Sequence, residues 1–364
     1  ESPLGGWTLS AFFHDFNRDG YLDMYSCSDF LSPDRFWVNN GKGGFSELSW
    51  PFIPKTSYSS MDVAWGDLNN DGLEDFFVVD MLARKREDRI RQTANMGPNV
   101  WMTWANGFNN QVMRNTLYRN RGDGSFSEIA LKSNLAASDW SWTTRFEDVD
   151  LDGLLDIIVG NGTPHDVQNS DAIDLLYSNK TTQKFSFLPA DLPPPNVSNV
   201  VWKNLGDFKF REFSDAWNFS SNSYSQSMAF GDLDGDGDNE VVINNFDGIP
   251  ELYRCDTISP RIVVRIDTGS HPGLLDRLRL ELKSGGKSQY RSVRTSQGYL
   301  SQSSTDIVFA CHDQVSELYI YGPGDISPIT TVSIERNSLA HIKVDPIDSR
   351  KPKRNDEVSL PGKE

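Results

Sequence analysis

One short acidic segment occurs four times in this chain, and it constrains the fold more than any other feature. The copies are "DFNRDGYLD" (15–23), "DLNNDGLED" (67–75), "DVDLDGLLD" (148–156) and "DLDGDGDNE" (232–240), which we call acidic loops 1 to 4. Each copy runs into a short apolar segment of the length of a β-strand. A repeat of a few strands cannot bury its faces alone, so the repeats must stack as propeller blades or as a solenoid.

A second element accompanies the acidic loops at a nearly constant separation. Its copies are "FWVNNGKGGF" (36–45), "LYRNRGDGSF" (117–126) and "VWKNLGDFKF" (201–210). Counted from Asn40, Asn120 and Asn204, the next acidic loop begins 27, 28 and 28 residues further on. The unit is a strand, a glycine-containing turn, a second strand, a linker strand and an acidic loop. Short strands separated by such turns predict an all-β fold, and the stacking of the repeats can be radial, as in a propeller, or linear, as in a solenoid.

The acidic loops have the residue types and spacing of a calcium-binding loop. Oxygen-bearing side chains occupy positions 1, 3 and 5, glycine occupies position 6, and position 9 is a carboxylate in every copy. Calcium takes six to eight oxygen ligands, and the backbone carbonyl of position 7 can supply one of them. The predicted ligands of about four Ca²⁺ sites are Asp15, Asn17, Asp19, Tyr21 and Asp23; Asp67, Asn69, Asp71, Leu73 and Asp75; Asp148, Asp150, Asp152, Leu154 and Asp156; and Asp232, Asp234, Asp236, Asp238 and Glu240.

An alternative explanation of one such loop is an ordinary hairpin turn, because aspartate and glycine are common turn residues. Four copies with the same ligand positions favour metal binding over that alternative. We expect the ions to have a structural role, because ions that rigidify stacked repeats are the simplest use of such sites.

The charge of the chain limits the classes of partner. Its 51 acidic and 35 basic side chains give a net charge of −16, which argues against binding to nucleic acid. The sequence has no run of eighteen apolar residues, so direct insertion into a membrane is not expected. The chain starts close to its first motif without a signal-peptide pattern, and we expect a processed chain or a fragment.

Two inserts interrupt the repeats, at about 82–112 and 163–198. The first is polar and compatible with a helix, whereas the second contains "LPPPN" and is expected to be a loop. Long inserts on a repeat scaffold often form the binding face. Trp101 and Trp104 in the first insert are candidates for a platform that stacks on sugars.

His165 and Asp166 are weak catalytic candidates in the second insert. They lie in "GTPHDVQNSD", just after a predicted strand, where a histidine beside a carboxylate could act in acid–base chemistry. A solvated loop histidine explains the same residues more simply. No nucleophile elbow, phosphate-binding loop or dinucleotide fingerprint occurs in the sequence.

The acidic loops and the Asn-Gly turns resemble the FG-GAP/VCBS repeats, which form calcium-binding β-propellers related to the integrin α head. The segments "DFFVVDML" (75–82), "NTLYRNRGDGSF" (115–126) and "DWSWTTRFEDVDLDG" (139–153) are similar to large secreted bacterial VCBS proteins. "LRLELKSGGKSQYRSVRTSQGYLSQ" (278–302) is similar to the ASPIC/UnbV domain that ends those proteins and that is shared with cartilage acidic protein. The segment "VFACHDQ" (308–314) departs from the glycine-rich turn of that domain.

The resemblance implies a β-propeller over residues 1–257 and an ASPIC/UnbV-like β-domain over 258–345. The segment 346–364 mixes charges without an apolar period, so we expect a disordered tail there. It also implies an extracellular or cell-envelope location and a role in adhesion or recognition of a glycan or a protein. Two alternatives stay open. One is a carbohydrate-active enzyme of the lyase or dehydratase type on the same scaffold, and the other is a purely structural segment of a larger surface protein.

Overall fold

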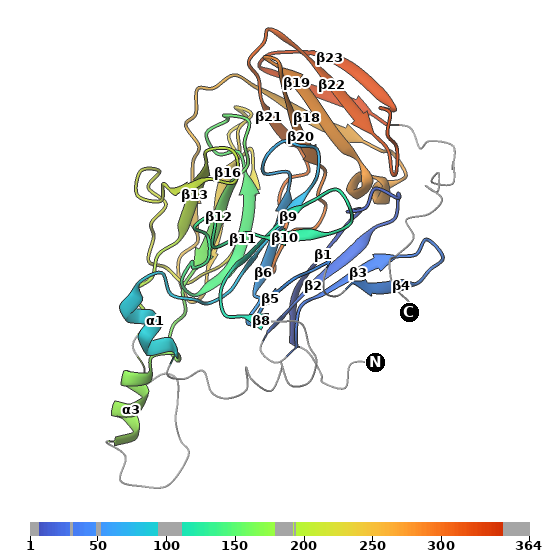
Figure 1. The fold of residues 1–364 in the computed structure, drawn as a ribbon. Coiled ribbons are helices and arrows are strands. Elements are labelled where there is room, and N and C mark those ends of the chain that lie inside the picture. Colours follow the sequence, from blue (N-terminus) through green and yellow to red (C-terminus); the bar gives the residue numbers. More distant parts are fainter. Residues whose placement is uncertain are drawn as a thin grey trace.

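The computed structural model describes residues 7–29, 32–48, 52–93, 111–178, 192 and 194–344. Four antiparallel sheets contain the four repeats, and we call them blades 1 to 4 (Figure 1). Blade 1 consists of β1 (Trp7–His14), β2 (Asp23–Asp29), β3 (Arg35–Asn39) and β4 (Phe45–Leu48), and blade 2 of β6 (Asp62–Gly66), β7 (Asp75–Val79), β9 (Thr116–Asn120) and β10 (Phe126–Glu128). Blade 3 consists of β11 (Ser141–Glu147), β12 (Asp156–Asn161), β13 (Val200–Asn204) and β14 (Phe210–Glu212), and blade 4 of β15 (Ser225–Gly231), β16 (Glu240–Asn245) and β17 (Glu251–Tyr253).

Every acidic loop closes the first hairpin of its blade in the same register. The residue before position 1 pairs with position 9, as His14 does with Asp23 and Gly66 with Asp75. The same pairing joins Glu147 to Asp156 and Gly231 to Glu240. The four repeats of the sequence are therefore equivalent in structure, and the predicted all-β, propeller-like fold is confirmed.

Neighbouring blades share hydrophobic cores, which explains why the repeats stack. Blades 1 and 2 share a cluster that includes Phe12, Tyr25 and Phe76, all of them buried. Blades 2 and 3 share a second cluster that includes Phe77 and Ile157. Burial of one such side chain stabilises the folded chain by about 1.5–3 kcal/mol relative to its exposure, so a single blade would lose much of its core if it stood alone.

Residues from Arg261 onward form two further sheets around a core of their own. One sheet has the order β21 (Ile307–Ala310), β18 (Arg261–Asp267) and β24 (Ser338–Lys343). The other has the order β20 (Lys287–Ser292), β19 (Arg279–Ser284), β22 (Val315–Tyr321) and β23 (Thr330–Glu335). We call this unit, with the 3₁₀ helix η2 (Pro272–Arg277), the C-terminal domain. It lies at one end of the blades, at the top of Figure 1.

A connector between β20 and β21, residues 293–306, leaves the C-terminal domain and runs along the inner strands of the blades. Its Tyr299 amide donates to Asp62 Oδ1 of β6 at 3.0 Å, and its Ser304 amide donates to the Phe230 carbonyl of β15 at 2.8 Å. The buried Arg145 of β11 donates to the Gln297 carbonyl at 2.7 Å and packs so closely on Gly298 that a Cβ there would lie 2.0 Å from its Nη1. Glycine is therefore required at that position.

Both inserts contain a helix at the end of the blades away from the C-terminal domain (Figure 1). The helix α1 (Arg86–Thr93) confirms that the first insert is compatible with a helix. At the end of that insert, the short strand β8 (Gln111–Val112) pairs in parallel with β5 (Thr56–Ser57). The second insert differs from the expected loop, because α3 (Ser170–Ser178) forms there. Its first turn is capped by Asn169, whose Oδ1 accepts the Ala172 amide at 3.1 Å, a local signal that the proline-rich segment further on obscured.

Trp101 and Trp104 lie outside the described residues, as does the expected tail at 346–364. None of the helices that the structure describes is long and apolar enough to cross a membrane.

Candidate metal centres

The carboxylate at position 1 holds the turn of each acidic loop. Asp15 accepts the amides of Asp19 and Gly20 at 3.0 and 2.7 Å, and the carboxylates of Asp67 and Asp148 accept the equivalent pairs of amides in loops 2 and 3. Asp232 accepts two glycine amides in loop 4. Each carboxylate oxygen has two lone pairs, so these bonds leave acceptor capacity for a cation.

Position 5 is turned toward its own loop in all four copies. Its Oδ1 accepts the amide of position 7 at 2.9–3.1 Å, with Asp19, Asp71, Asp152 and Asp236 as the acceptors. Its second oxygen stays free of that contact. The shared geometry shows that position 5 shapes the loop as well as adding charge to it.

The carboxylate at position 9 joins the acidic loop to the second repeated element. In loop 2, Asp75 accepts the Leu68 amide at 3.2 Å and the Asn120 amide at 2.9 Å, and in loop 3 Asp156 makes the same two bonds, to Val149 and Asn204. In loop 4, Glu240 accepts only the Leu233 amide, at 2.8 Å, among the described residues. The predicted ligand at position 9 therefore also has a structural role in the hairpin.

The asparagine of the second element completes this connection, which the sequence did not reveal. Its side chain donates to the carbonyl of position 8 and accepts the amide of the glycine two residues on, as in Asn120 with Glu74 and Gly122. In blade 1 the equivalent residue is Asn39 rather than Asn40, because Asn39 makes these contacts with Leu22 and Gly41. Counted from Asn39, the separation to Asp67 becomes 28 residues, as in the other two repeats.

One predicted ligand oxygen in each of loops 2, 3 and 4 is suited to bind a cation. In loops 2 and 3, Asn69 Oδ1 and Asp150 Oδ1 are buried and accept no hydrogen bond from the described residues, and in loop 4 the same holds for Glu240 Oε1. A buried acceptor without a partner costs about 1–3 kcal/mol. Hard oxygen ligands of this kind suit Ca²⁺, so the donor set fits the ion that the sequence predicts.

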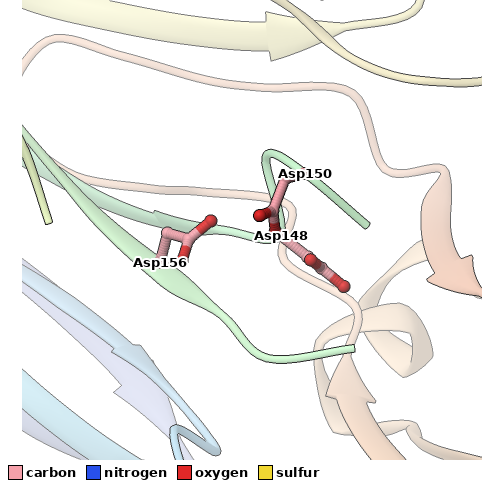
Figure 2. A group of neighbouring side chains, drawn as sticks. All are labelled: Asp148, Asp150 and Asp156. Carbon is pink, nitrogen blue, oxygen red and sulfur yellow. The ribbon is translucent and has the colours of Figure 1, made fainter. Parts of the chain in front are cut away.

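Loop 3 brings three predicted ligands together. Asp148, Asp150 and Asp156 each offer an oxygen within 4.8 Å of the others, with Asp156 entering from the start of β12 (Figure 2). The ammonium of Lys203, on β13, contacts both Asp150 and Asp152, and the guanidinium of Arg291 lies 3.4 Å from Asp148 Oδ2. Two basic side chains thus already neutralise part of this cluster.

Loop 4 forms the second carboxylate cluster of the described residues, from Asp232, Asp234 and Glu240 within the same distance. Arg261 of β18 contacts the remaining two acids, Asp238 directly and Asp236 at 3.8 Å. Loop 4 is the most exposed of the four, whereas Glu240 at its end is buried.

Burial raises the pKa of the loop carboxyls, and neighbouring carboxylates add to the effect. The pKa of Asp15 rises to about 6, that of Asp67 to about 7 and that of Asp148 to about 7. The pKa of Asp23 rises to about 8, mainly by burial and less by Asp15 and Asp19. Crowded carboxylates with raised pKa values bind a cation readily, because the ion stabilises the charged form that burial disfavours.

His165 and Asp166 follow β12 in the second insert. The His165 ring lies 3.1 Å from the Leu192 carbonyl through Nδ1, and burial raises the pKa of Asp166. The hydrogen bonds of the described residues do not join the two side chains to each other, so their catalytic role stays a prediction.

A cavity of about 260 Å³ lies between blades 3 and 4 and reaches the C-terminal domain. Aromatic side chains of Trp217, Phe219 and Tyr253 line it, together with Glu147, whose pKa is raised by burial, and Asn239, which donates to Glu147 at 2.9 Å. The cavity has a mixed aromatic and polar lining, but it is smaller than the roughly 300–1,000 Å³ of typical small-ligand pockets.

Comparison with solved structures finds a lectin of Agrocybe aegerita, described as recognising non-reducing terminal N-acetylglucosamine. It is 12% identical, with a TM-score of 0.32, and the alignment covers 90% of this chain and 65% of that one. The chain thus spans less than two thirds of the lectin structure. No curated protein sequence matches the chain.

Comparison with family models gives a match to the FG-GAP-like repeat over residues 15–78, 100–159 and 167–243. Each matched segment ends in the strand that follows an acidic loop, in β7, β12 and β16 respectively. The matched segments cover more than half of the chain and contain all four acidic loops, whereas the resemblance of residues 258–345 to the ASPIC/UnbV domain stays a prediction. The chain belongs to the FG-GAP-like repeat family.

Proposed function

We propose that this protein is a calcium-binding recognition module, with one Ca²⁺ in each acidic loop and a glycan or protein ligand bound elsewhere. The observation that carries the metal assignment is the set of buried, unpartnered oxygens at the predicted ligand positions, Asn69 Oδ1, Asp150 Oδ1 and Glu240 Oε1. Each ion would hold oxygens of positions 1, 3, 5 and 9 and would offset the repulsion within one loop. The ions rigidify the hairpins on which neighbouring blades pack.

The recognition face lies on the inserts, at the opposite end of the blades from the acidic loops. The C-terminal domain docks on the acidic-loop end and occupies much of that surface (Figure 1). At the other end, Arg91 of α1 lies 3.4 Å from Asp171 of α3, and Gln92 of α1 donates at 2.9 Å to Gln168, which precedes α3 in the second insert. Two inserts from different blades thus form one projecting surface, as expected of a ligand-binding face on a repeat scaffold.

An extracellular or cell-envelope location suits this function. Calcium sites in extracellular modules bind in the range of roughly 10⁻⁴–10⁻³ M, which matches ions that are permanently available outside the cell. Lys203 and Arg261, from strands outside the loops, already pair with carboxylates of loops 3 and 4, which is consistent with such a modest affinity for Ca²⁺.

The metal assignment is tested by calorimetric titration of the EDTA-treated protein with Ca²⁺, together with thermal melting. We expect about four ions bound and a rise in Tm with Ca²⁺ concentration. Asp150→Ala should remove one ion and most of its share of that rise. Asp215→Ala, which removes an exposed carboxylate outside the acidic loops, is the matched control and should leave the titration unchanged. Absence of binding at millimolar Ca²⁺ would reject the assignment.

The recognition function is tested by screening the Ca²⁺-loaded protein on arrays of glycans and of extracellular proteins. A bound ligand should be lost with the double substitution Arg91→Ala and Asp171→Ala on the insert face. It should be retained with Trp217→Ala in the cavity between blades 3 and 4. The opposite pattern would place the ligand in the cavity, and turnover of a bound glycan that is lost in His165→Ala would favour the enzyme instead.

A further inference from the structure

The C-terminal domain contacts all four acidic loops. Arg277 donates to the Gly20 carbonyl of loop 1, and the Tyr290 amide donates to Asn70 Oδ1 of loop 2 at 3.3 Å. Arg291 pairs with Asp148 of loop 3, and Arg261 pairs with Asp238 of loop 4. The end of the blades that carries the predicted metal sites is therefore also the docking surface of the domain.

Position 4 of the loops has an unusual backbone and is not a predicted metal ligand. It is left-handed in every copy, with φ of 59° at Arg18, 55° at Asn70, 51° at Leu151 and 81° at Gly235. A left-handed conformation costs a residue other than glycine roughly 1 kcal/mol. Such a cost persists only where the surrounding structure compensates for it.

Asn70 and Leu151 find that compensation at the domain interface. The Asn70 side chain donates to the Gly153 carbonyl of loop 3 at 2.9 Å and accepts the Tyr290 amide of β20, so it joins two acidic loops to the domain. Leu151 is buried in a small hydrophobic cluster with Val263, Val308 and Ala310 of the domain. Arg18, in contrast, is exposed at the equivalent position of loop 1.

We infer that cation binding to loops 2 and 3 is thermodynamically coupled to docking of the C-terminal domain, through the position-4 residues Asn70 and Leu151. The inference rests on the proposed calcium binding and adds regulation of the same sites. A bound ion fixes the turn over positions 1 to 5, and that turn presents position 4 to the domain. By reciprocity, a docked domain holds the turn in the form that binds the ion and raises the affinity.

The basic residues of the interface do not oppose this coupling. Arg261 contacts Asp236 and Asp238, whereas the clustered oxygens of loop 4 belong to Asp232, Asp234 and Glu240. Of the ligands at positions 1, 3, 5 and 9, a cation in loop 4 would share only Asp236 with Arg261, which approaches that carboxylate to 3.8 Å. Arg291 contacts only Oδ2 of Asp148, and Oδ1, which accepts only the Asp152 amide among the described residues, retains a lone pair for a cation.

Hydrogen exchange of the wild-type protein, with Ca²⁺ and with EDTA, tests the coupling directly. The reporters are the Tyr299 and Ser304 amides, which donate from the connector to the inner strands of the blades. We expect their protection to fall at least fivefold in EDTA, the lower end of typical coupling between sites, while β19 inside the domain stays protected. Calcium binding by titration with equal protection in both conditions would overturn the coupling and leave the calcium assignment intact.

A double variant tests the reciprocal effect, which is that of domain docking on Ca²⁺ affinity. Asn70→Gly combined with Leu151→Gly removes the docking side chains, tolerates the left-handed backbone and keeps every predicted ligand. We expect at least a fivefold weaker apparent Ca²⁺ affinity at two of the four sites. Asp247→Gly makes the same backbone change at an exposed left-handed residue of blade 4 outside the acidic loops, and should leave the affinity unchanged. Unaltered affinity in the folded double variant would overturn the inference, and the exchange experiment decides the matter if that variant does not fold.

Discussion

Acidic loops 1 and 2 manage their negative charge differently from loops 3 and 4. Loops 1 and 2 have asparagine at position 3, and its amide donates to position 5 within the loop, from Asn69 to Asp71 at 2.8 Å for example. Loops 3 and 4 have aspartate there and recruit a basic side chain from outside, Lys203 in loop 3 and Arg261 in loop 4. Among the described residues, no ion pair involves a predicted ligand carboxylate of loops 1 or 2.

The difference shows that the same repulsion can be offset from within the loop or from a neighbouring element. An internal amide removes one negative charge and adds one donor, so the loop depends little on the rest of the fold. An external ammonium or guanidinium allows one more carboxylate around the cation, but this basic group competes with the cation for the carboxylates. The conformation of the loop then also depends on the packing of other strands.

The largest expected effect separates loop 2 from loop 4 at position 9. Asp75→Ala leaves two buried amides, of Leu68 and Asn120, without their acceptor, so we expect a loss of about 3 kcal/mol in the free energy of unfolding in EDTA. Glu240→Ala frees one amide only and should cost about 1.5 kcal/mol. Urea unfolding of both variants measures the difference, and equal losses would contradict the structural role of the second amide.

The pH dependence of the metal-free protein should be the next largest effect, counted for each carboxyl. Burial raises the pKa of Asp67 and of Asp148 to about 7, above the ordinary value near 4 that the unfolded chain retains. The folded state therefore binds more protons, and its stability is fully present below pH 4 and is lost as the pH rises through about 7. We expect each of these two carboxyls to lower the free energy of unfolding in EDTA by about 2–3 kcal/mol between pH 5 and 8.

Saturating Ca²⁺ should remove most of that decline, because the ion stabilises the ionised carboxylates. The measurement is chemical unfolding at fixed pH values in EDTA and in Ca²⁺. A stability that rises with pH in EDTA would show that the loop carboxyls do not have raised pKa values.

A smaller effect follows from removal of the counter-ion of loop 3. Lys203→Met leaves Asp150 and Asp152 without their ammonium, so the free energy of unfolding in EDTA should fall by about 1 kcal/mol, whereas Ca²⁺ should bind loop 3 more tightly. Arg119→Met is the matched control, because Arg119 also precedes the turn asparagine of its blade but lies over the Phe208 ring instead. Calorimetric titration of both variants checks the contrast, which fails if Lys203→Met weakens Ca²⁺ binding.

The contrast between Lys203 and Arg119 also shows which features of the molecule the sequence could predict. The period of the repeats, the strands that flank each acidic loop and the residue types of the predicted ligands are local properties, and local pattern was sufficient for them. The pairing of Lys203 with Asp150 spans 53 residues, and that of Arg291 with Asp148 spans 143, so both depend on how blades and domain pack. The residue count that starts at Asn40 is one short because two adjacent asparagines fit the same local pattern and Asn39 makes the contacts.

The smallest expected effect comes from converting loop 2 to the composition of loop 3. Asn69→Asp replaces the internal amide donor with a fourth carboxylate, so the EDTA-treated protein should lose about 0.5–1 kcal/mol and Ca²⁺ should bind more tightly. Among the described residues, no basic side chain pairs with the predicted ligands of loop 2 as Lys203 does in loop 3, but Arg119 lies at the equivalent place on β9 and could turn toward the new charge. If the double substitution Asn69→Asp and Arg119→Met is less stable in EDTA than the sum of its parts, Arg119 has taken over the role of Lys203. Strict additivity would mean instead that a basic residue at this position of the strand does not by itself supply a counter-ion. The pairing in loop 3 would then depend on the shorter and more flexible side chain of lysine.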